Sequence, residues 1–150
     1  MVTMPDVRLL LLINLTLSAL LTGLIWIIQV VHYPGFLRVG AENFLAYQHG
    51  HMRTISYVVV PLMLGELAAA LWLLFILPWP SWLAYVASGM VVLIWLDTFL
   101  VFVPLHNKLV EEGYNVLLIR RLILDNWVRT VAWSVRTLVL FHLMTLFIRE

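Results

Sequence analysis

Four long apolar stretches constrain the fold of this 150-residue chain more than any other feature of its sequence. They run from about 9 to 31, 54 to 77, 82 to 103 and 127 to 148. A helix needs about 20 mostly apolar residues to cross the hydrocarbon layer of a bilayer. The sequence therefore predicts an all-α, integral membrane bundle of four transmembrane helices, formed as a single domain over residues 1–150 and without an internal repeat.

The composition excludes several other classes of protein. Hydrophobic residues make up 63% of the chain and charged residues 11%, whereas soluble domains hold about 45–50% and about 25%. Disordered chains are poor in hydrophobic residues and rich in charge, so disorder is excluded as well. The absence of cysteine excludes disulfides and thiolate metal sites. A net charge of +1 gives no support to nucleic-acid binding.

The links between the predicted spans differ in length. Residues 77–81 contain Pro78 and Pro80 and predict a tight turn, because proline stops both neighbouring helices. The links 32–53 and 104–126 are long, and their apolar-polar patterns predict helix that lies at the interface or extends a span. The first apolar stretch is too long for a signal peptide, and no small-residue cleavage site follows it.

The second helix is predicted to begin before its apolar stretch does. Phe44, Tyr47 and His51 recur at helical spacing, which favours a start near Ala41. Pro61 lies in the interior of this predicted helix. A proline there predicts a kink, because it removes one backbone hydrogen bond and crowds the preceding turn.

Basic residues are distributed unequally between the two faces of the predicted bundle. The face with the long links holds Arg38, Arg53, Lys108, Arg120, Arg121 and Arg129. The face with both termini and the short turn holds Arg8 and Arg149. Cytoplasmic loops carry the excess of lysine and arginine. We therefore expect the long links in the cytoplasm and both termini outside, in a bacterial inner membrane.

Histidines collect at the predicted cytoplasmic ends of the spans. His32 ends the first span, His51 opens the second and His106 follows the third. Imidazole is the commonest metal ligand, and three imidazoles can hold zinc, copper or iron with one position left open. The sequence thus predicts that these three histidines bind a metal ion or the iron of haem b. The alternative is a site without a cofactor, in which each histidine is an amphipathic interfacial residue, as we expect for His49 and His142.

The fourth span carries polar residues on one face. Asn126, Arg129, Trp133 and Arg136 are spaced 3, 4 and 3 residues apart, so they share one side of a helix. Asn126 and Arg129 are predicted to polarise a substrate or to stabilise its developing negative charge. Trp133 is predicted to stack on a guanidinium or on a planar ligand. The candidate cofactor contacts are His51, Tyr47 and Trp133.

Two carboxylates lie inside the predicted spans, where an ionised side chain is costly unless it is paired. Asp97 matches Arg136 in depth, so we expect these two to form a pair, which is either catalytic or only a structural link between helices. Glu66 then needs another partner, a proton or a cation. Glu66 or Asp97 is the predicted proton carrier of an acid–base reaction.

Several of these segments resemble the anthrone-oxygenase-like family of small membrane proteins. The resemblance rests on Pro104-Leu105-His106-Asn107 after the third span, and on Asn126-Trp127-Val128-Arg129 with Arg136 in the fourth. It implies oxidation of a lipophilic aromatic compound. A second resemblance, in architecture only, is to small membrane haem enzymes that isomerise epoxides. In those enzymes one histidine on the second helix holds the iron, and here that position is His51.

These observations favour a small membrane enzyme, an oxidoreductase or isomerase that acts on a lipophilic small molecule near the cytoplasmic interface. One alternative is a non-enzymatic accessory subunit of a larger membrane complex, in which the polar residues only hold helices together. Another is a transporter or proton pathway, which needs polar residues through the whole bilayer. Membrane lipid is a predicted partner in each case, and a homo-oligomer is compatible with all three.

Overall fold

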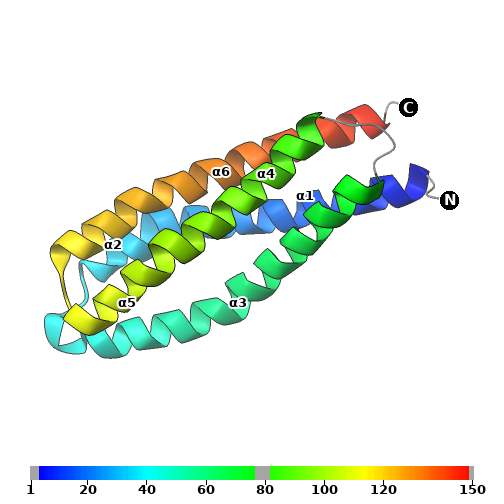
Figure 1. Cartoon of the computed structure of the whole chain (residues 1–150). Helices are drawn as coiled ribbons and strands as arrows, with labels where there is room; N and C mark the ends of the chain where they lie inside the picture. Colours follow the sequence, from blue (N-terminus) through cyan, green and yellow to red (C-terminus); the bar gives the residue numbers. More distant parts are fainter. Residues whose placement is uncertain (1–3, 77–81, 149–150) are drawn as a thin grey trace.

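The computed structural model describes residues 4–76 and 82–148, which form helices and short links without a strand (Figure 1). In chain order the elements are α1 (Met4–Ile27), the π-helix η1 (Ile28–His32), α2 (Tyr33–Phe36), α3 (Ala41–Ile76), α4 (Trp82–Asp97), the π-helix η2 (Thr98–Phe102), α5 (Val103–Glu112) and α6 (Val116–Ile148). The all-helical fold that the apolar stretches predict is confirmed.

Four continuous helical runs are each long and apolar enough to cross a membrane: Asp6–Phe36, Ala41–Ile76, Trp82–Glu112 and Val116–Ile148. They extend beyond the apolar stretches, because most of the two long polar links is helical. The second run begins at Ala41, as the spacing of its aromatic residues predicts. It contains Pro61 and bends along its length (Figure 1). The predicted turn at 77–81 lies outside the described residues.

The bundle has two distinct ends (Figure 1). The link end holds the segments 37–40 and 113–115, which join α2 to α3 and α5 to α6. The terminal end is the opposite one, where α1 begins and α6 ends. α1 and α4 each pack against both α3 and α6, so α3 and α6 lie across a diagonal of the bundle.

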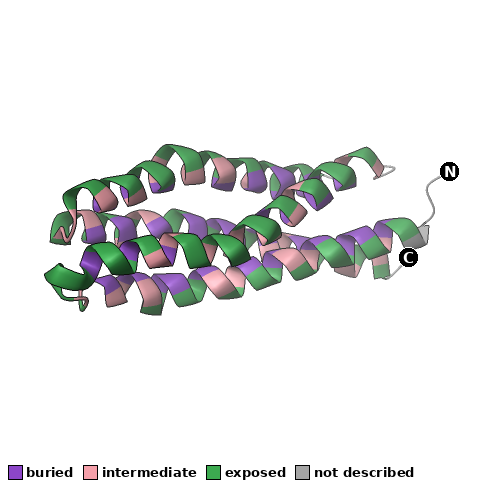
Figure 2. Ribbon diagram, turned by 90° about the horizontal axis from the view of Figure 1, so that it is seen from below, coloured by how far each residue is buried: buried purple, intermediate pink, exposed green. Residues whose placement is uncertain are grey.

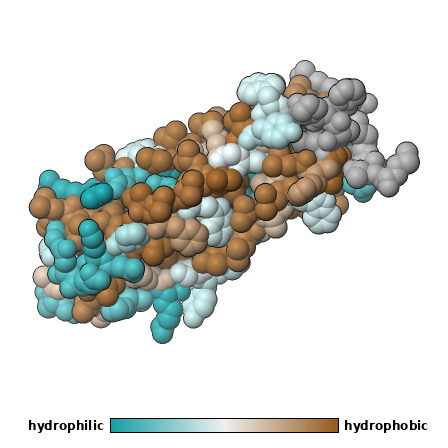
Figure 3. Space-filling view, in the orientation of Figure 1, coloured by the Kyte–Doolittle hydropathy of each residue, from teal (hydrophilic) through white to brown (hydrophobic). Residues whose placement is uncertain are grey.

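Buried residues lie on the inward sides of the helices and exposed residues on their outward sides (Figure 2). The exposed ones include large apolar residues on every long helix, such as Ile27, Phe75, Phe99 and Leu138. Hydrophilic residues gather at the link end, and hydrophobic residues cover the middle (Figure 3). An apolar outer surface of this kind is typical of helices that contact lipid tails.

Two π-helical turns interrupt the spans, each directly before a residue-proline pair. In η1 the backbone N–H of Tyr33 donates to the carbonyl five residues earlier, and at the end of η2 that of Val103 does the same. Pro34 and Pro104 come next. Proline has no N–H, and its ring crowds the carbonyl four residues before it, so the wider turn relieves the clash. Each π turn therefore changes which side chains face the bundle interior.

The two halves of the chain repeat one order of elements. Each half has a spanning helix, a π turn, a short helix with a proline near its start, and a long returning helix. Pro34 in the first half and Pro104 in the second occupy equivalent positions. The side chains at most equivalent positions differ, which explains why the sequence predicts no internal repeat although the architecture contains one.

The link between α5 and α6 is short, and its sequence determines both helix ends. Gly113 follows α5 with a φ of 72°, a conformation that glycine adopts more readily than other residues. Asn115 caps α6, since its side-chain oxygen accepts from the backbone N–H of Leu117 at 3.0 Å and of Leu118 at 3.2 Å. A residue near the end of α5 and a residue the same number of positions after the start of α6 therefore lie at a similar depth in the bundle.

Two apolar clusters form the core, and a polar layer lies between them. The cluster toward the link end includes Ile25, Phe36 and Leu122. The cluster toward the terminal end includes Leu11, Leu73 and Leu140. Between the clusters lie four fully buried polar side chains, Asn14, Ser18, Glu66 and Arg136.

Candidate functional site

Three imidazoles from three helical segments lie together near the link end. His32 ends η1, His51 lies on α3 and His106 lies on α5. His32 Nε2 and His51 Nδ1 are 2.7 Å apart, and the ring centroids of His51 and His106 are 5.5 Å apart. In a contact between two ring nitrogens, one donates and the other accepts, so the two rings share one proton. The three histidines that the sequence places at one level are thus neighbours.

Tyr33 and Gln48 hold His106 in place. The Tyr33 hydroxyl lies 3.2 Å from His106 Nε2, and Gln48 Nε2 lies 2.9 Å from His106 Nδ1. Both ring nitrogens of His106 are therefore engaged by the protein. We refer to His32, Tyr33, Gln48, His51 and His106 together as the imidazole cluster.

This geometry does not fit the predicted three-histidine metal site. A histidine ligand offers the lone pair of a ring nitrogen, and both nitrogens of His106 are hydrogen-bonded to Tyr33 and Gln48. The nitrogens of His32 and His51 that face each other are occupied by their mutual contact. Within residues 4–76 and 82–148, no group of three or more His, Cys, Asp or Glu side chains is arranged to hold a metal ion.

A cavity of about 230 Å³ opens beside His32 and His51. Its other lining residues are Leu24, Ile27, Ile28, Thr54 and Ile55. Apart from the imidazoles, the only polar side chain among these residues is that of Thr54, whose hydroxyl donates to backbone carbonyls of its own helix. Pockets for drug-sized ligands measure about 300–1,000 Å³, so this cavity is smaller than a typical site for a whole molecule of that size.

Arg129 lies next to the imidazole cluster, on α6. Its buried guanidinium is centred 4.2 Å from the ring centroid of Phe102 and 5.3 Å from that of Trp133. In the described part of the chain it forms no salt bridge, and its Nε has no hydrogen-bond partner. It interacts electrostatically with Tyr33 and Asp97 instead. The predicted stacking of Trp133 on a guanidinium is observed, and Arg129 brings a positive charge close to Tyr33.

Arg136 pairs with Glu66, so the predicted pair of Asp97 and Arg136 is wrong. Arg136 Nη1 lies 2.8 Å from Glu66 Oε1, and both side chains are fully buried. The other Glu66 oxygen accepts from Trp133 Nε1 at 3.1 Å. These contacts cross the diagonal between α3 and α6, which the long side chains bridge.

Asn14 extends this arrangement to α1. Its Oδ1 accepts from Arg136 Nη2 at 3.1 Å, and its Nδ2 donates to the Leu10 and Ala69 carbonyls at 3.1 and 2.9 Å. Arg136 Nε donates to the Ala87 carbonyl at 3.1 Å. None of these side-chain atoms is among the buried polar atoms of the described residues that lack a partner. We refer to Asn14, Glu66, Trp133 and Arg136 together as the ion-pair network.

The positions of the helix ends explain why Asp97 does not meet Arg136. Asp97 and Arg136 lie at similar depths when depth is counted from the ends of the apolar stretches. The helices, however, continue beyond those stretches to the short link between Glu112 and Val116. Measured from that link, Asp97 is nearly level with Arg129, and Arg136 lies about two helical turns farther away. The Asp97 Oδ2 atom is buried and has no hydrogen-bond partner among the described residues.

Two other predicted site residues lie at the margin of this region. Asn126 is buried and donates to Gln29 Oε1 at 2.8 Å, which joins α6 to η1. Tyr47 is 40% exposed, with its ring centroid 6.3 Å from that of His32. The remaining histidines, His49 and His142, are exposed and make no ring contact with the imidazole cluster.

Sequence reasoning missed Tyr33, Gln48 and Phe102. Gln48 has a usable signal, because it lies three residues before His51 and so shares its helix face. Tyr33 and Phe102 lie on different helical segments, and their rings stack with centroids 6.5 Å apart. A helical pattern relates residues within one helix, so it could not have paired these two.

Comparison with known proteins does not assign this chain to a family. No family model matches it, and neither the curated proteins nor the solved structures contain a match. The resemblance to the anthrone-oxygenase-like family therefore stays a prediction. The geometry of the imidazole cluster and its cavity is the basis on which a function can be inferred.

Proposed function

We propose that this protein is a small integral membrane enzyme that moves a proton within a lipophilic small molecule and so acts as an isomerase. The observation that carries the proposal is the 2.7 Å contact between His32 Nε2 and His51 Nδ1 at the wall of an apolar cavity. Imidazole is the side chain best suited to gain and lose a proton near neutral pH. Two imidazoles in contact beside one cavity supply both a base and an acid.

The proposed reaction needs no co-reactant. His32 Nδ1 and His51 Nε2 are the ring nitrogens of the pair that make no hydrogen bond with a described residue. One imidazole removes a proton from a C–H bond next to a double bond of the substrate, and the electron pair of that bond forms a new double bond. The old double bond opens, and its far carbon receives a proton from the imidazole pair. Substrate and product are isomers, so atoms and electrons balance.

The rest of the imidazole cluster has a supporting part in this proposal, and the residues predicted to be catalytic lie outside the cavity wall. Tyr33, Gln48 and His106 are positioning residues, because none of them lines the cavity. Arg129 adds positive charge close to Tyr33 and does not line the cavity either. The remaining predicted catalytic residues also lie outside the cavity wall: Glu66, Asp97, Asn126 and Arg136.

The cavity wall supports a lipophilic substrate. Ile27 lines the cavity and is also 59% exposed on the outer surface, so the cavity opens toward the face that we place in lipid. A volume of about 230 Å³ holds the reacting end of a molecule. The rest of that molecule would stay among the lipid tails, which removes the cost of transferring it into water.

Deuterium incorporation tests the proposal before the substrate is known. The purified protein is placed in vesicles of a total membrane lipid extract in D₂O, and the lipophilic molecules are analysed by mass spectrometry. We expect at least one of them to gain deuterium on carbon faster than in vesicles without protein. The His51→Gln variant should slow this exchange by about 10²–10⁴-fold, the usual contribution of a general acid or base.

His49→Gln is the matched control, because it changes an exposed histidine two residues away on the same helix. Its exchange rate should equal that of the unmodified protein. Absence of exchange with the unmodified protein, or equal rates with His51→Gln, would contradict the proposal.

Three kinds of measurement separate the rival hypotheses. An absorption spectrum and metal analysis that reveal a haem or metal ion needed for exchange would favour the metal-dependent oxidoreductase or isomerase. Stoichiometric co-purification with one large complex, without exchange, would favour the accessory subunit. Proton flux across liposomes without exchange would favour the proton pathway.

We also propose that the link end lies in the cytoplasm of a bacterium and that both termini lie outside. Arg129 is buried, so it does not act as a topology signal. The other basic residues of the links still outnumber those of the opposite face, by five to two. The chain has no cysteine, so a Glu112→Cys variant can be tested alone, and a membrane-impermeant thiol reagent added outside should not label it.

A further inference from the structure

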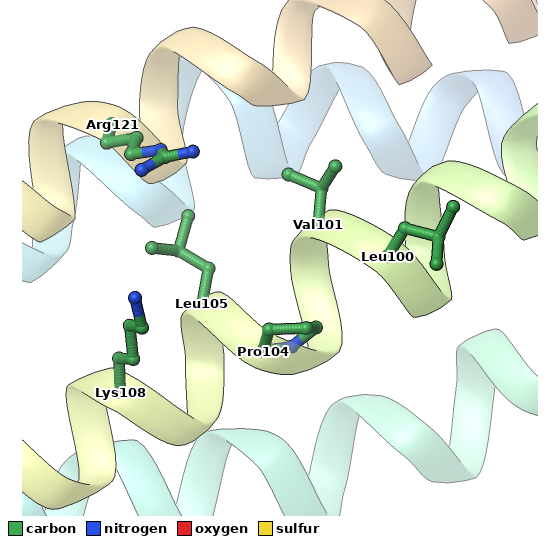
Figure 4. A pocket seen from close by; sticks show the side chains of 6 residues that line it. All are labelled: Leu100, Val101, Pro104, Leu105, Lys108 and Arg121. Carbon is green, nitrogen blue, oxygen red and sulfur yellow. The ribbon is translucent and has the colours of Figure 1, made fainter.

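A second groove lies between the α5 region and α6, in the other half of the molecule (Figure 4). It has a volume of about 170 Å³ and is lined by Leu100, Val101, Pro104, Leu105, Lys108 and Arg121. It is the counterpart of the cavity beside His32, since each lies between a span with a π turn and the long helix that follows. The wall of one hollow carries the imidazoles of His32 and His51, and the wall of the other carries the cations Lys108 and Arg121.

The groove changes from apolar to cationic along its length. Its four apolar residues lie on η2 and the first turn of α5, and Lys108 follows Pro104 by four residues on the same helix face. Lys108 lies about one turn before the end of α5, and Arg121 lies slightly more than one turn after the start of α6. Because the link is short, the two cations are level with each other near the link end. Figure 4 shows their side chains on either side of the gap between the two helices.

Both cations have donors available for a ligand. In the described part of the chain, Lys108 forms no salt bridge. Arg121 donates through Nε to Asp125 Oδ2 at 3.3 Å, which leaves the donors on its two terminal nitrogens. The Arg121 side chain is 65% exposed, and none of the six lining residues is acidic. The groove therefore joins two positive charges to an apolar wall.

We propose that this groove binds one anionic phospholipid of the surrounding membrane. The phosphate lies between Lys108 and Arg121, and an acyl chain follows Leu100 and Val101 toward the middle of the bundle. Basic pockets between transmembrane helices near the membrane surface suit anionic head groups, and both lysine and arginine bind phosphate well. Leu100 is 72% exposed, so the bound chain remains continuous with the bilayer. This site is separate from the imidazole cluster and does not depend on the proposed reaction.

Lipid titration followed by native mass spectrometry tests the site. Protein in a neutral detergent is titrated with dioleoyl phosphatidylglycerol or with dioleoyl phosphatidylcholine, which has the same acyl chains but no net charge. We expect one phosphatidylglycerol to bind at least tenfold more tightly than phosphatidylcholine. The double variant Lys108→Gln with Arg121→Gln should weaken phosphatidylglycerol binding about 30-fold, since each basic side chain near an anionic membrane surface contributes about fivefold.

The double variant Arg38→Gln with Arg53→Gln is the matched control. It removes the same charge from exposed positions that do not line the groove, so binding should change by less than about twofold. A third variant, Val101→Trp, fills the apolar part of the groove and leaves both cations, so it should weaken phosphatidylglycerol as well. Thermal unfolding of each variant verifies that it is folded.

Two results would overturn the proposal. Equal losses in the groove variant and the control would show that only overall charge attracts the lipid. Competition by glycerol phosphate, which has the headgroup phosphate without acyl chains, at the same concentration as the lipid would show that the cations bind a free phosphate.

Discussion

The ion-pair network and the imidazole cluster are both polar groups inside one apolar bundle, but they are built in opposite ways. In the ion-pair network, Glu66 and Arg136 are fully buried, and every oxygen and nitrogen of their side chains that lacks contact with solvent has a partner. In the imidazole cluster, His32 and His106 are only half-buried, and the cluster borders a cavity. Next to it lie Arg129 Nε and Asp97 Oδ2, which have no hydrogen-bond partner in the described part of the chain.

We infer that this difference separates groups that serve the fold from groups that serve the proposed reaction. A polar group in apolar surroundings costs free energy unless it is hydrogen-bonded, so a fully satisfied network stabilises one arrangement of helices. Unpartnered buried atoms, and the ring nitrogens of His32 and His51 that make no hydrogen bond with a described residue, give no such stabilisation. Changes in the ion-pair network should therefore affect stability, and changes in the imidazole cluster should affect activity.

The largest expected loss of stability comes from Arg136→Leu. It leaves Glu66 buried without its ion-pair partner, and breaking a buried pair costs about 3–5 kcal/mol of unfolding free energy. Equilibrium unfolding in mixed micelles measures this loss. The double variant Glu66→Leu with Arg136→Leu should recover much of it, because an apolar replacement of a whole pair is often neutral. Losses that simply add would show that the two residues do not act as a pair.

His32→Gln should reduce activity strongly and stability only slightly, the opposite of what we expect for Arg136→Leu. It removes one half of the proton-sharing pair, so we expect deuterium exchange to slow by about 10²–10⁴-fold. One partly buried hydrogen bond is lost, so the unfolding free energy should fall by only about 0.5–1.5 kcal/mol. Exchange rate and unfolding are measured on the same preparation. A stability loss as large as that of Arg136→Leu would remove the distinction between the two regions.

A matched pair of single hydrogen-bond deletions sharpens the comparison. Trp133→Phe keeps a ring but removes the N–H that donates to Glu66, which should cost about 1–3 kcal/mol of stability and leave exchange unchanged. Tyr33→Phe keeps a ring but removes the hydroxyl at His106, which should slow exchange up to about tenfold at a stability cost of about 1 kcal/mol. Slower deuterium exchange in Trp133→Phe but not in Tyr33→Phe would contradict the assignment of stability to the ion-pair network and of activity to the imidazole cluster.

Metal removal should have the smallest effect. Both nitrogens of His106 are hydrogen-bonded within the protein, so the three histidines are not free to share an ion. Treatment with a chelator should therefore leave both the exchange rate and the unfolding free energy unchanged. Metal content is measured before and after treatment. Activity that is lost on chelation and restored by zinc would contradict the prediction.

Much of the fold could be predicted because the membrane-spanning pattern is local. Long apolar stretches are sufficient to predict helices, since in lipid every backbone N–H and C=O must be satisfied within its own helix. The start of α3 at Ala41 follows from the spacing of Phe44, Tyr47 and His51, which is also a local property. The same reasoning places His32, His51 and His106 at one end of the bundle.

The partners of the buried polar groups could not be predicted from the sequence. Asp97 and Glu66 are both reasonable partners for Arg136, and the choice depends on where α5 and α6 end and on which helices face each other across the diagonal. The contact between His32 and His51 depends on η1, because one extra residue in a turn rotates the following side chains by about 100° around the helix axis. Apolar periodicity is a property of a single segment. The depth of a side chain in the bundle and its rotation about the helix axis depend on how several segments pack. The sequence alone therefore establishes the helices and the level of the histidines, and the tertiary structure decides which polar atoms meet.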